Sequence, residues 1–274
     1  MFTQLLTGIG GAILGLASIL ALLAGFVWIV ELIRRHREDR SGFSEFIKSG
    51  ARMQHPALLS AFEGKGPEAP AGAKPRLETI SCGRLRLKSG QVFVCDPAFC
   101  NDKDLEPFDE PMPEGEHPVH ALIIDNDGDQ RVAAVKITVN DQSLHHIEPA
   151  WTASARANAL KHRILPAFGV DSANAAVFSF ESLESMRADT RDPSEFVPGP
   201  DDPKINPYLS GRTDDLWKET VFADGSNCFL FLSGLGDGAY PCYFGKTEQG
   251  SIVCLLIDFG FFGEPTRIGY PQAQ

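Results

Sequence analysis

A run of 23 residues without a charged side chain, from Gly8 to Val30, constrains the fold of this chain most strongly. As an α-helix, which rises about 1.5 Å per residue, it is long enough to cross the roughly 30 Å hydrocarbon core of a bilayer. Trp28 lies near its end, where tryptophan favours the membrane interface. A cleavable signal peptide begins with basic residues, but here the basic cluster Arg34–Arg37 follows the run. We therefore predict a retained single-pass transmembrane helix.

The same basic cluster predicts the orientation of the chain. Positive residues beside a transmembrane helix stay on the cytoplasmic side, so we expect the globular part inside the cell. Gly11 and Gly15 form a GxxxG pair, a spacing that lets two helices approach closely in a homodimer. Because small residues are common in membrane helices generally, an anchor that does not dimerise is the alternative.

The composition divides the chain into three parts. Residues 1–40 form the anchor with its basic flank, and residues 41–75 form a juxtamembrane segment and linker. Apolar residues at helical spacing predict a short helix within residues 41–62, whereas residues 63–75 are rich in Gly, Pro and Ala, as linkers are. Residues 76–274 form the globular domain.

Alternating apolar residues predict strands throughout the globular part. Leu85 and Leu87 precede a Lys-Ser-Gly turn and Val92 and Val94 follow it, which predicts a hairpin. A second hairpin is expected over residues 118–139, a helix over residues 150–165, and a pair of apolar strands over residues 230–259. The fold class is therefore α+β, mainly antiparallel β with one or two helices, preceded by a single N-terminal transmembrane helix.

The charge of the chain favours some partners over others. The formal net charge is −11; residues 1–50 carry +1, from five basic and four acidic residues, and the remainder carries −12, from 20 basic and 32 acidic residues. An acidic domain repels phosphate backbones, which argues against nucleic acid, and attracts basic proteins. Solubility alone is the other explanation. Residues 189–213 form a Pro-rich acidic loop, and its candidate binding residues are Asp189, Asp192, Glu195, Asp201 and Asp202.

No pattern in the sequence satisfies a metal site or a cofactor site. Cys95 and Cys100 lack a matching second pair for zinc. The Asp125–Gln130 stretch resembles an EF-hand loop, but Gln130 and Lys136 occupy the positions that need glycine and glutamate. His145 and His146, with Glu148 nearby, would still need a distant ligand. We predict neither a metal nor a cofactor.

Two polar turns hold the catalytic candidates. Cys228 follows the polar turn of "FADGSNCF", and a nucleophilic cysteine needs a histidine or another group that lowers its pKa. Asp237 and Tyr240 lie in "SGLGDGAYPCYFG", which is equally explained as a tight turn before a strand. If the two turns face one another, Asp224, Cys228, Asp237 and Tyr240 form one site; if they are apart, the motif is a feature of the fold.

Several segments occur in an order typical of one known family. They are "SGQVFVCDP", "PFDEPMPEGEHPV", the strand at residues 131–139, the lone Trp151, "FADGSNCF" and "GDGAYPCYFGKTEQGSIVCLLIDF". Over about residues 80–260 the chain resembles the bacterial domain of unknown function 4241 family. The turn before Cys228 is slightly altered from the usual pattern. The resemblance implies no established activity, and it associates the chain with toxin and immunity neighbourhoods in bacteria.

These observations favour a membrane-anchored, non-enzymatic protein-binding module at the bacterial inner membrane. Such a module would be a toxin immunity or effector-partner protein whose partner is a basic toxin domain. One alternative is a hydrolase or transferase built on Asp224, Cys228, Asp237 and Tyr240. A further alternative is a scaffold in an envelope assembly.

Overall fold

A computed structural model describes residues 42–65, 75–188 and 216–268. The predicted transmembrane helix with Gly11 and Gly15, the Arg34–Arg37 cluster, most of the linker and the acidic loop lie outside these residues. Within the described part, no helix combines the length and apolar character needed to span a membrane. The chain divides into two compact units, Met1–Lys48 and Ser49–Gln274. In the first unit, residues 42–48 are helical.

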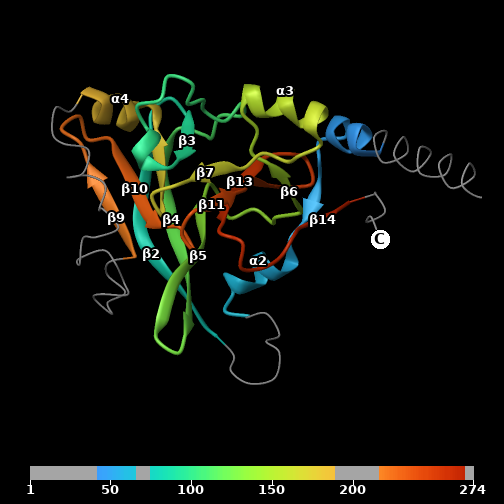
Figure 1. Ribbon diagram of the computed structural model, residues 1–274, viewed down its shortest axis with the longest axis horizontal. Helices are drawn as coiled ribbons and strands as arrows, with labels where there is room; N and C mark the ends of the chain where they lie inside the picture. Colours follow the sequence, from blue (N-terminus) through green and yellow to red (C-terminus); the bar gives the residue numbers. More distant parts are fainter. Residues whose placement is uncertain (1–41, 66–74, 189–215, 269–274) are drawn as a thin grey trace, which may run out of the picture. The chain divides into compact units, whose positions relative to one another are not determined.

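The second unit consists mainly of strands, coloured along the chain in Figure 1. Its strands are β1 (Met53–Gln54), β2 (Arg76–Leu87), β3 (Val92–Cys95), β4 (Gly115–Asn126), β5 (Asp129–Thr138), β6 (His146–Pro149), β7 (Phe168–Val170), β8 (Asn174–Ser179), β9 (Trp217–Val221), β10 (Asn227–Leu232), β11 (Gly238–Tyr240), β12 (Cys242–Lys246), β13 (Ile252–Asp258) and β14 (Thr266–Arg267). Its helices are α2 (Pro56–Ala61), the 3₁₀ helix η1 (Pro97–Phe99), α3 (Ala153–His162) and α4 (Phe180–Ala188).

The strands form three sheets in which neighbours run antiparallel. The largest has eight strands in the order β14-β1-β6-β12-β13-β5-β4-β2, the second has four in the order β3-β8-β10-β9, and β11 pairs with β7. This arrangement confirms the expectation of a mainly antiparallel β domain with few helices.

The core lies between the two larger sheets. Alternate residues of their strands meet there, because successive side chains of a strand point to opposite faces. Leu85, Val135 and Leu255 from the eight-stranded sheet share one cluster with Val177 and Phe229 from the four-stranded sheet. The unit is therefore a sandwich held by apolar packing.

Helices cover the outer faces of both sheets. On the four-stranded sheet, Leu183 and Met186 of α4 pack with Phe178 and Leu230. On the eight-stranded sheet, α2 lies near β13, because its N-cap residue His55 bonds through Nε2 to Oδ2 of Asp258 at 3.1 Å. These helices therefore cover part of each outer face.

One predicted hairpin is confirmed and the other is wrong. β4 and β5 pair as expected, joined by a turn at Asp127 and Gly128 whose φ values are 55° and 94°. Two successive positive φ values are typical of a two-residue hairpin turn. The segment at residues 85–94 is no hairpin, because β2 joins the eight-stranded sheet and β3 the four-stranded one. Its turn carries the chain from one layer of the sandwich to the other.

The globular unit also begins earlier than expected, at Ser49 instead of residue 76. β1 pairs with both β14 and β6, so it belongs to the eight-stranded sheet. The single helix expected within residues 41–62 is interrupted because Gly50 and Ala51 have φ values of 95° and 53°. Left-handed residues end a right-handed helix, and the helical turns on either side belong to different units.

Candidate functional site

The turn before β10 is held by Asp224. Its Oδ1 accepts hydrogen bonds from the backbone N of Ser226 at 3.0 Å and from the Ser226 hydroxyl at 2.6 Å. The Ser226 hydroxyl bond is the main cause of a pKa for Asp224 below the ordinary value. Gly225, with φ of 80°, supplies the left-handed position of the turn. The carboxylate of Asp224 therefore closes its own turn.

Cys228 lies inside the protein, with 1% of its surface exposed. It belongs to the apolar cluster beneath α4, together with Phe93 and Phe178. Burial raises the pKa of its thiol to about 12, the reverse of what an activated nucleophile needs. The other cysteines of the chain are also free and buried. The surroundings of Cys228 are those of a small core residue.

Asn227, which the sequence reasoning passed over, joins the two large sheets at one corner. It is fully buried, donates through Nδ2 to the carbonyl of Arg84 at 2.8 Å, and accepts from the backbone N of Arg86 at 2.9 Å. Nδ2 also donates to Oε1 of Glu219 at 2.7 Å. One side chain thus takes the place of a strand along part of the β2 edge. The signal in the sequence that could have identified Asn227 was its position between a polar turn and an apolar strand.

The polar residues of the second candidate turn also form hydrogen bonds within the fold. Tyr240 is 7% exposed, and its hydroxyl donates to the carbonyl of Gly236 at 2.8 Å. Burial, followed by the nearby charge of Asp237, raises the pKa of that hydroxyl. Asp237 accepts from the backbone N of Ala173 at 3.1 Å, so it binds the β7–β8 connection rather than its own turn.

A buried aspartate that was also missed from the sequence, Asp96, holds the same connection. Asp96 is 1% exposed; its Oδ2 accepts from the backbone N of Asp171 at 2.8 Å and of Ser172 at 2.7 Å. Its Oδ1 accepts from the Ser172 hydroxyl at 2.6 Å and from the N of Ala98 at 2.8 Å. Buried carboxylates need such partners because desolvation is costly. Asp96 therefore fixes where β7, β8 and η1 meet.

The two candidate turns lie at opposite ends of β10. Asp224 precedes Asn227–Leu232, and Asp237 and Tyr240 follow it. Six strand residues at about 3.3 Å each separate the turns by roughly 20 Å. The structure does not bring Asp224, Cys228, Asp237 and Tyr240 together as one site.

A polar cluster surrounds Lys246. Its Nζ donates to Oε2 of Glu110 at 2.6 Å and lies 2.9 Å from Oε2 of Glu148. Burial acts to lower the pKa of Lys246, but the two carboxylates outweigh it and the pKa is raised. A lysine held in its charged form is a poor nucleophile. The cluster therefore ties the β3–β4 connection to β12.

The adjacent histidines lie beside the same cluster. His146 bonds through Nε2 to Oε1 of Glu148 at 3.0 Å, while the ring of His145 lies beside that of His146. Across residues 42–65, 75–188 and 216–268, no group of three or more His, Cys, Asp or Glu side chains is placed to hold a metal ion.

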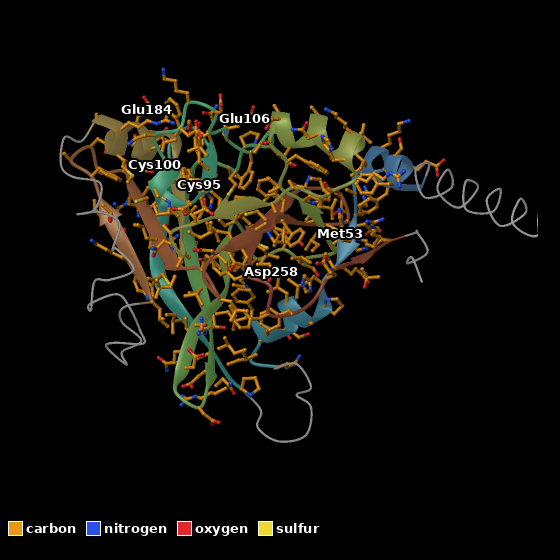
Figure 2. The ribbon with its side chains drawn as sticks, viewed as in Figure 1. Met53, Cys95, Cys100, Glu106, Glu184 and Asp258 are labelled. Carbon is orange, nitrogen blue, oxygen red and sulfur yellow. The ribbon has the colours of Figure 1, made fainter. Side chains whose placement is uncertain are left out.

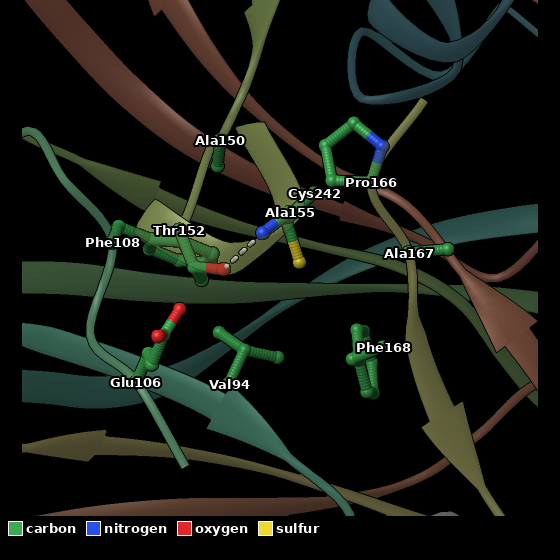
Figure 3. Close-up of a pocket in the computed structure, with 10 residues that line it drawn as sticks. All are labelled: Val94, Glu106, Phe108, Ala150, Thr152, Ala155, Pro166, Ala167, Phe168 and Cys242. Atoms are coloured by element: carbon green, nitrogen blue, oxygen red, sulfur yellow. Dashed lines mark hydrogen bonds between the residues drawn. The ribbon is translucent and has the colours of Figure 1, made fainter. Parts of the chain in front are cut away.

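A small pocket opens between α3, β3 and β12, as Figure 3 shows. Its volume is about 80 Å³. Small-molecule sites usually measure roughly 300–1,000 Å³, so this pocket is too small for a metabolite. Its lining residues are Val94, Glu106, Phe108, Ala150, Thr152, Ala155, Pro166, Ala167, Phe168 and Cys242.

The surface beside this pocket is acidic. Residues 101–114, here called the acidic connection, link β3 to β4 and contain six Asp or Glu and one Lys. Asp102, Asp104 and Glu114 are exposed. Figure 2 shows Glu106 and Glu184 along the same rim of the unit. The predicted binding residues of the loop after α4, namely Asp189, Asp192, Glu195, Asp201 and Asp202, lie outside the described residues.

The comparisons with known proteins give one result. A family model described as "Protein of unknown function (DUF4241)" matches residues 85–257, more than half of the chain. Searches among curated proteins and among solved structures each returned no match. The matched segment runs from β2 to β13 and includes Asp96, Asn227, Asp237 and Tyr240.

Proposed function

We propose, from the starting point that this chain belongs to the DUF4241 family, that it is a membrane-anchored protein-binding module. Its partner would be a basic protein domain, as in a toxin immunity or effector-partner protein of the bacterial inner membrane. The anchor in this proposal is the uncharged run Gly8–Val30, with the globular unit on the cytoplasmic side.

The acidic connection is the observation that carries the proposal. It presents carboxylates at the surface, where charged patches steer oppositely charged proteins into contact. Arg187 near the end of α4 donates to the carbonyls of Cys100 and Asp102, both at 3.1 Å. The end of α4 therefore lies against the acidic connection, and in the sequence the residue after α4, Asp189, is the first of the acidic loop.

The hydrolase or transferase alternative finds less support. The thiol of Cys228 is buried and its pKa is raised. Asp237 and Tyr240 form hydrogen bonds with backbone groups. Catalytic groups need access to a substrate and a pKa suited to proton transfer. Cys228 instead packs in the core, Tyr240 supports its own turn, and Asp237 holds the β7–β8 connection.

Affinity purification of the full-length chain from its bacterial host tests the proposal. The measurement is the set of proteins recovered and identified by mass spectrometry. A neutralised variant removes three exposed charges of the acidic connection: Asp102→Asn, Asp104→Asn and Glu114→Gln. A matched control removes three exposed charges elsewhere: Asp127→Asn, Asp141→Asn and Glu248→Gln.

We expect one dominant partner with a strongly basic domain, recovered by the wild type, the control and Cys228→Ala. The neutralised variant should lose it, and recovery should fall with added salt because salt screens exposed charges. Recovery of several envelope subunits in fixed proportion would favour the scaffold alternative. A partner that binds the neutralised variant undiminished would refute the role of the acidic connection.

A further inference from the structure

The pocket beside α3 has walls of two chemical kinds. Val94, Phe108 and Phe168 give it an apolar interior. The thiol of Cys242 also faces it, and burial raises the pKa of that thiol, so it stays uncharged. Glu106 is the exception, since it brings a carboxylate to the lining. Figure 3 shows this carboxylate on the side opposite Phe168.

The carboxylate of Glu106 is held in place by α3. Its Oε2 accepts a hydrogen bond from the backbone N of Ser154 at 2.8 Å, in the first turn of the helix. This bond is the main cause of a lowered pKa for Glu106, so the group is ionised at neutral pH. Thr152 caps the same helix by accepting from the N of Ala155. An ionised carboxylate therefore stands fixed beside an apolar hollow.

The size of the pocket limits what it can take. A volume of about 80 Å³ is far below the roughly 300–1,000 Å³ of sites for whole small molecules, and it suits part of one side chain. A lysine has an apolar four-carbon stem and a compact cationic head, so it matches both kinds of wall. A purely apolar side chain would press against Glu106 and strip it of water without pairing its charge.

We propose that this pocket binds one lysine side chain of the partner protein. The stem lies against Val94, Phe108 and Phe168, and the ammonium group donates to the carboxylate of Glu106. This rests on the proposed function as a binding module for a basic protein, and it names the contact that would anchor that protein. Anchor residues in preformed pockets contribute most of the binding energy in many interfaces.

The test uses the full-length chain in lipid nanodiscs with labelled alanine and valine methyl groups. The probe is N-acetyl-lysine methylamide, and its neutral counterpart is N-acetyl-norleucine methylamide, which keeps the stem and lacks the charge. We expect saturable shifts of the Val94, Ala155 and Ala167 methyl resonances, with a dissociation constant of about 1 mM or weaker for so small a ligand. The norleucine probe should bind more weakly by about two- to fivefold, as expected for one partly exposed ion pair.

Two pairs of variants complete the test. Ala155→Leu fills the pocket and should abolish the shifts, whereas Ala157→Leu, at an exposed position of the same helix, should leave them. Glu106→Gln retains an acceptor for Ser154 and should reduce lysine binding to the norleucine level, whereas Glu184→Gln should not. Equal binding of both probes, shifts that survive Ala155→Leu, or no saturable shift would each overturn the proposal. A basic partner that still binds the Ala155→Leu chain would overturn the pocket assignment and leave the proposed function standing.

Discussion

The four hydrogen bonds that Asp96 accepts lead to a quantitative prediction for the substitution Asp96→Asn. Asparagine has nearly the same shape, but one oxygen becomes an amino group that cannot accept hydrogen bonds. Each Asp96 oxygen accepts two bonds, so either orientation of the amide loses two of them. Hydrogen bonds to charged groups contribute about 1.5–3 kcal/mol each. We expect the free energy of unfolding to fall by about 3–5 kcal/mol, using the lower part of that range.

The matched control is Asp224→Asn. Asp224 forms a similar turn, but only its Oδ1 accepts the two hydrogen bonds from Ser226 and its side chain is 40% exposed, so asparagine can keep both bonds. Thermal unfolding of the full-length chain supplies the measurement. For a unit of this size about 1 kcal/mol lowers the midpoint by 2–4 °C, so Asp96→Asn should lose about 6–20 °C and the control about 4 °C at most. Unfolding midpoints of the two variants that agree to within experimental error would refute the stabilising role of the Asp96 hydrogen bonds.

Two further predictions concern pKa values. Because burial raises the pKa of Cys228 to about 12, iodoacetamide should leave Cys228 unmodified at neutral pH in the folded chain and modify it after denaturation; labelling at the rate of a free cysteine would contradict the buried position. The pKa of Lys246 is raised, so its ion pairs with Glu110 and Glu148 stabilise the fold fully below about pH 10.4 and lose that effect as pH rises through the folded value. Lys246→Gln should cost about 1–3 kcal/mol at neutral pH and flatten the alkaline loss of stability seen by chemical denaturation, and an unchanged alkaline profile would argue against the pairs.

Local patterns in the sequence were sufficient for parts of the fold. The β4–β5 hairpin follows from alternating apolar residues around Asp127 and Gly128, which accept the positive φ that a tight turn requires. Helix α3 follows from its spacing and from Thr152, whose hydroxyl caps the first turn. In both cases the decisive contacts join residues close in sequence.

Long-range partners could not be predicted in the same way. The residues around Gly90 have a hairpin pattern, yet the partner of β3 is β8, more than 80 residues later. Asp96 and Asn227 take part in bonds to residues 75 or more positions away, and alternation of apolar residues carries no information about such pairs. The catalytic candidates were selected because polar residues in turns that flank strands are typical of sites. In this structure Asp224, Asp237 and Tyr240 instead form hydrogen bonds with backbone groups at the ends of strands.

The position of Asn227 has a consequence for self-association. β2 is the last strand of the eight-stranded sheet, and a free strand edge can recruit a strand from another molecule. Asn227 occupies the carbonyl of Arg84 and the amide of Arg86, which are two of the groups that an incoming strand would need. A single internal side chain thus shields this end of the sheet from edge-to-edge aggregation. Replacing it would expose a templating edge as well as loosen the corner.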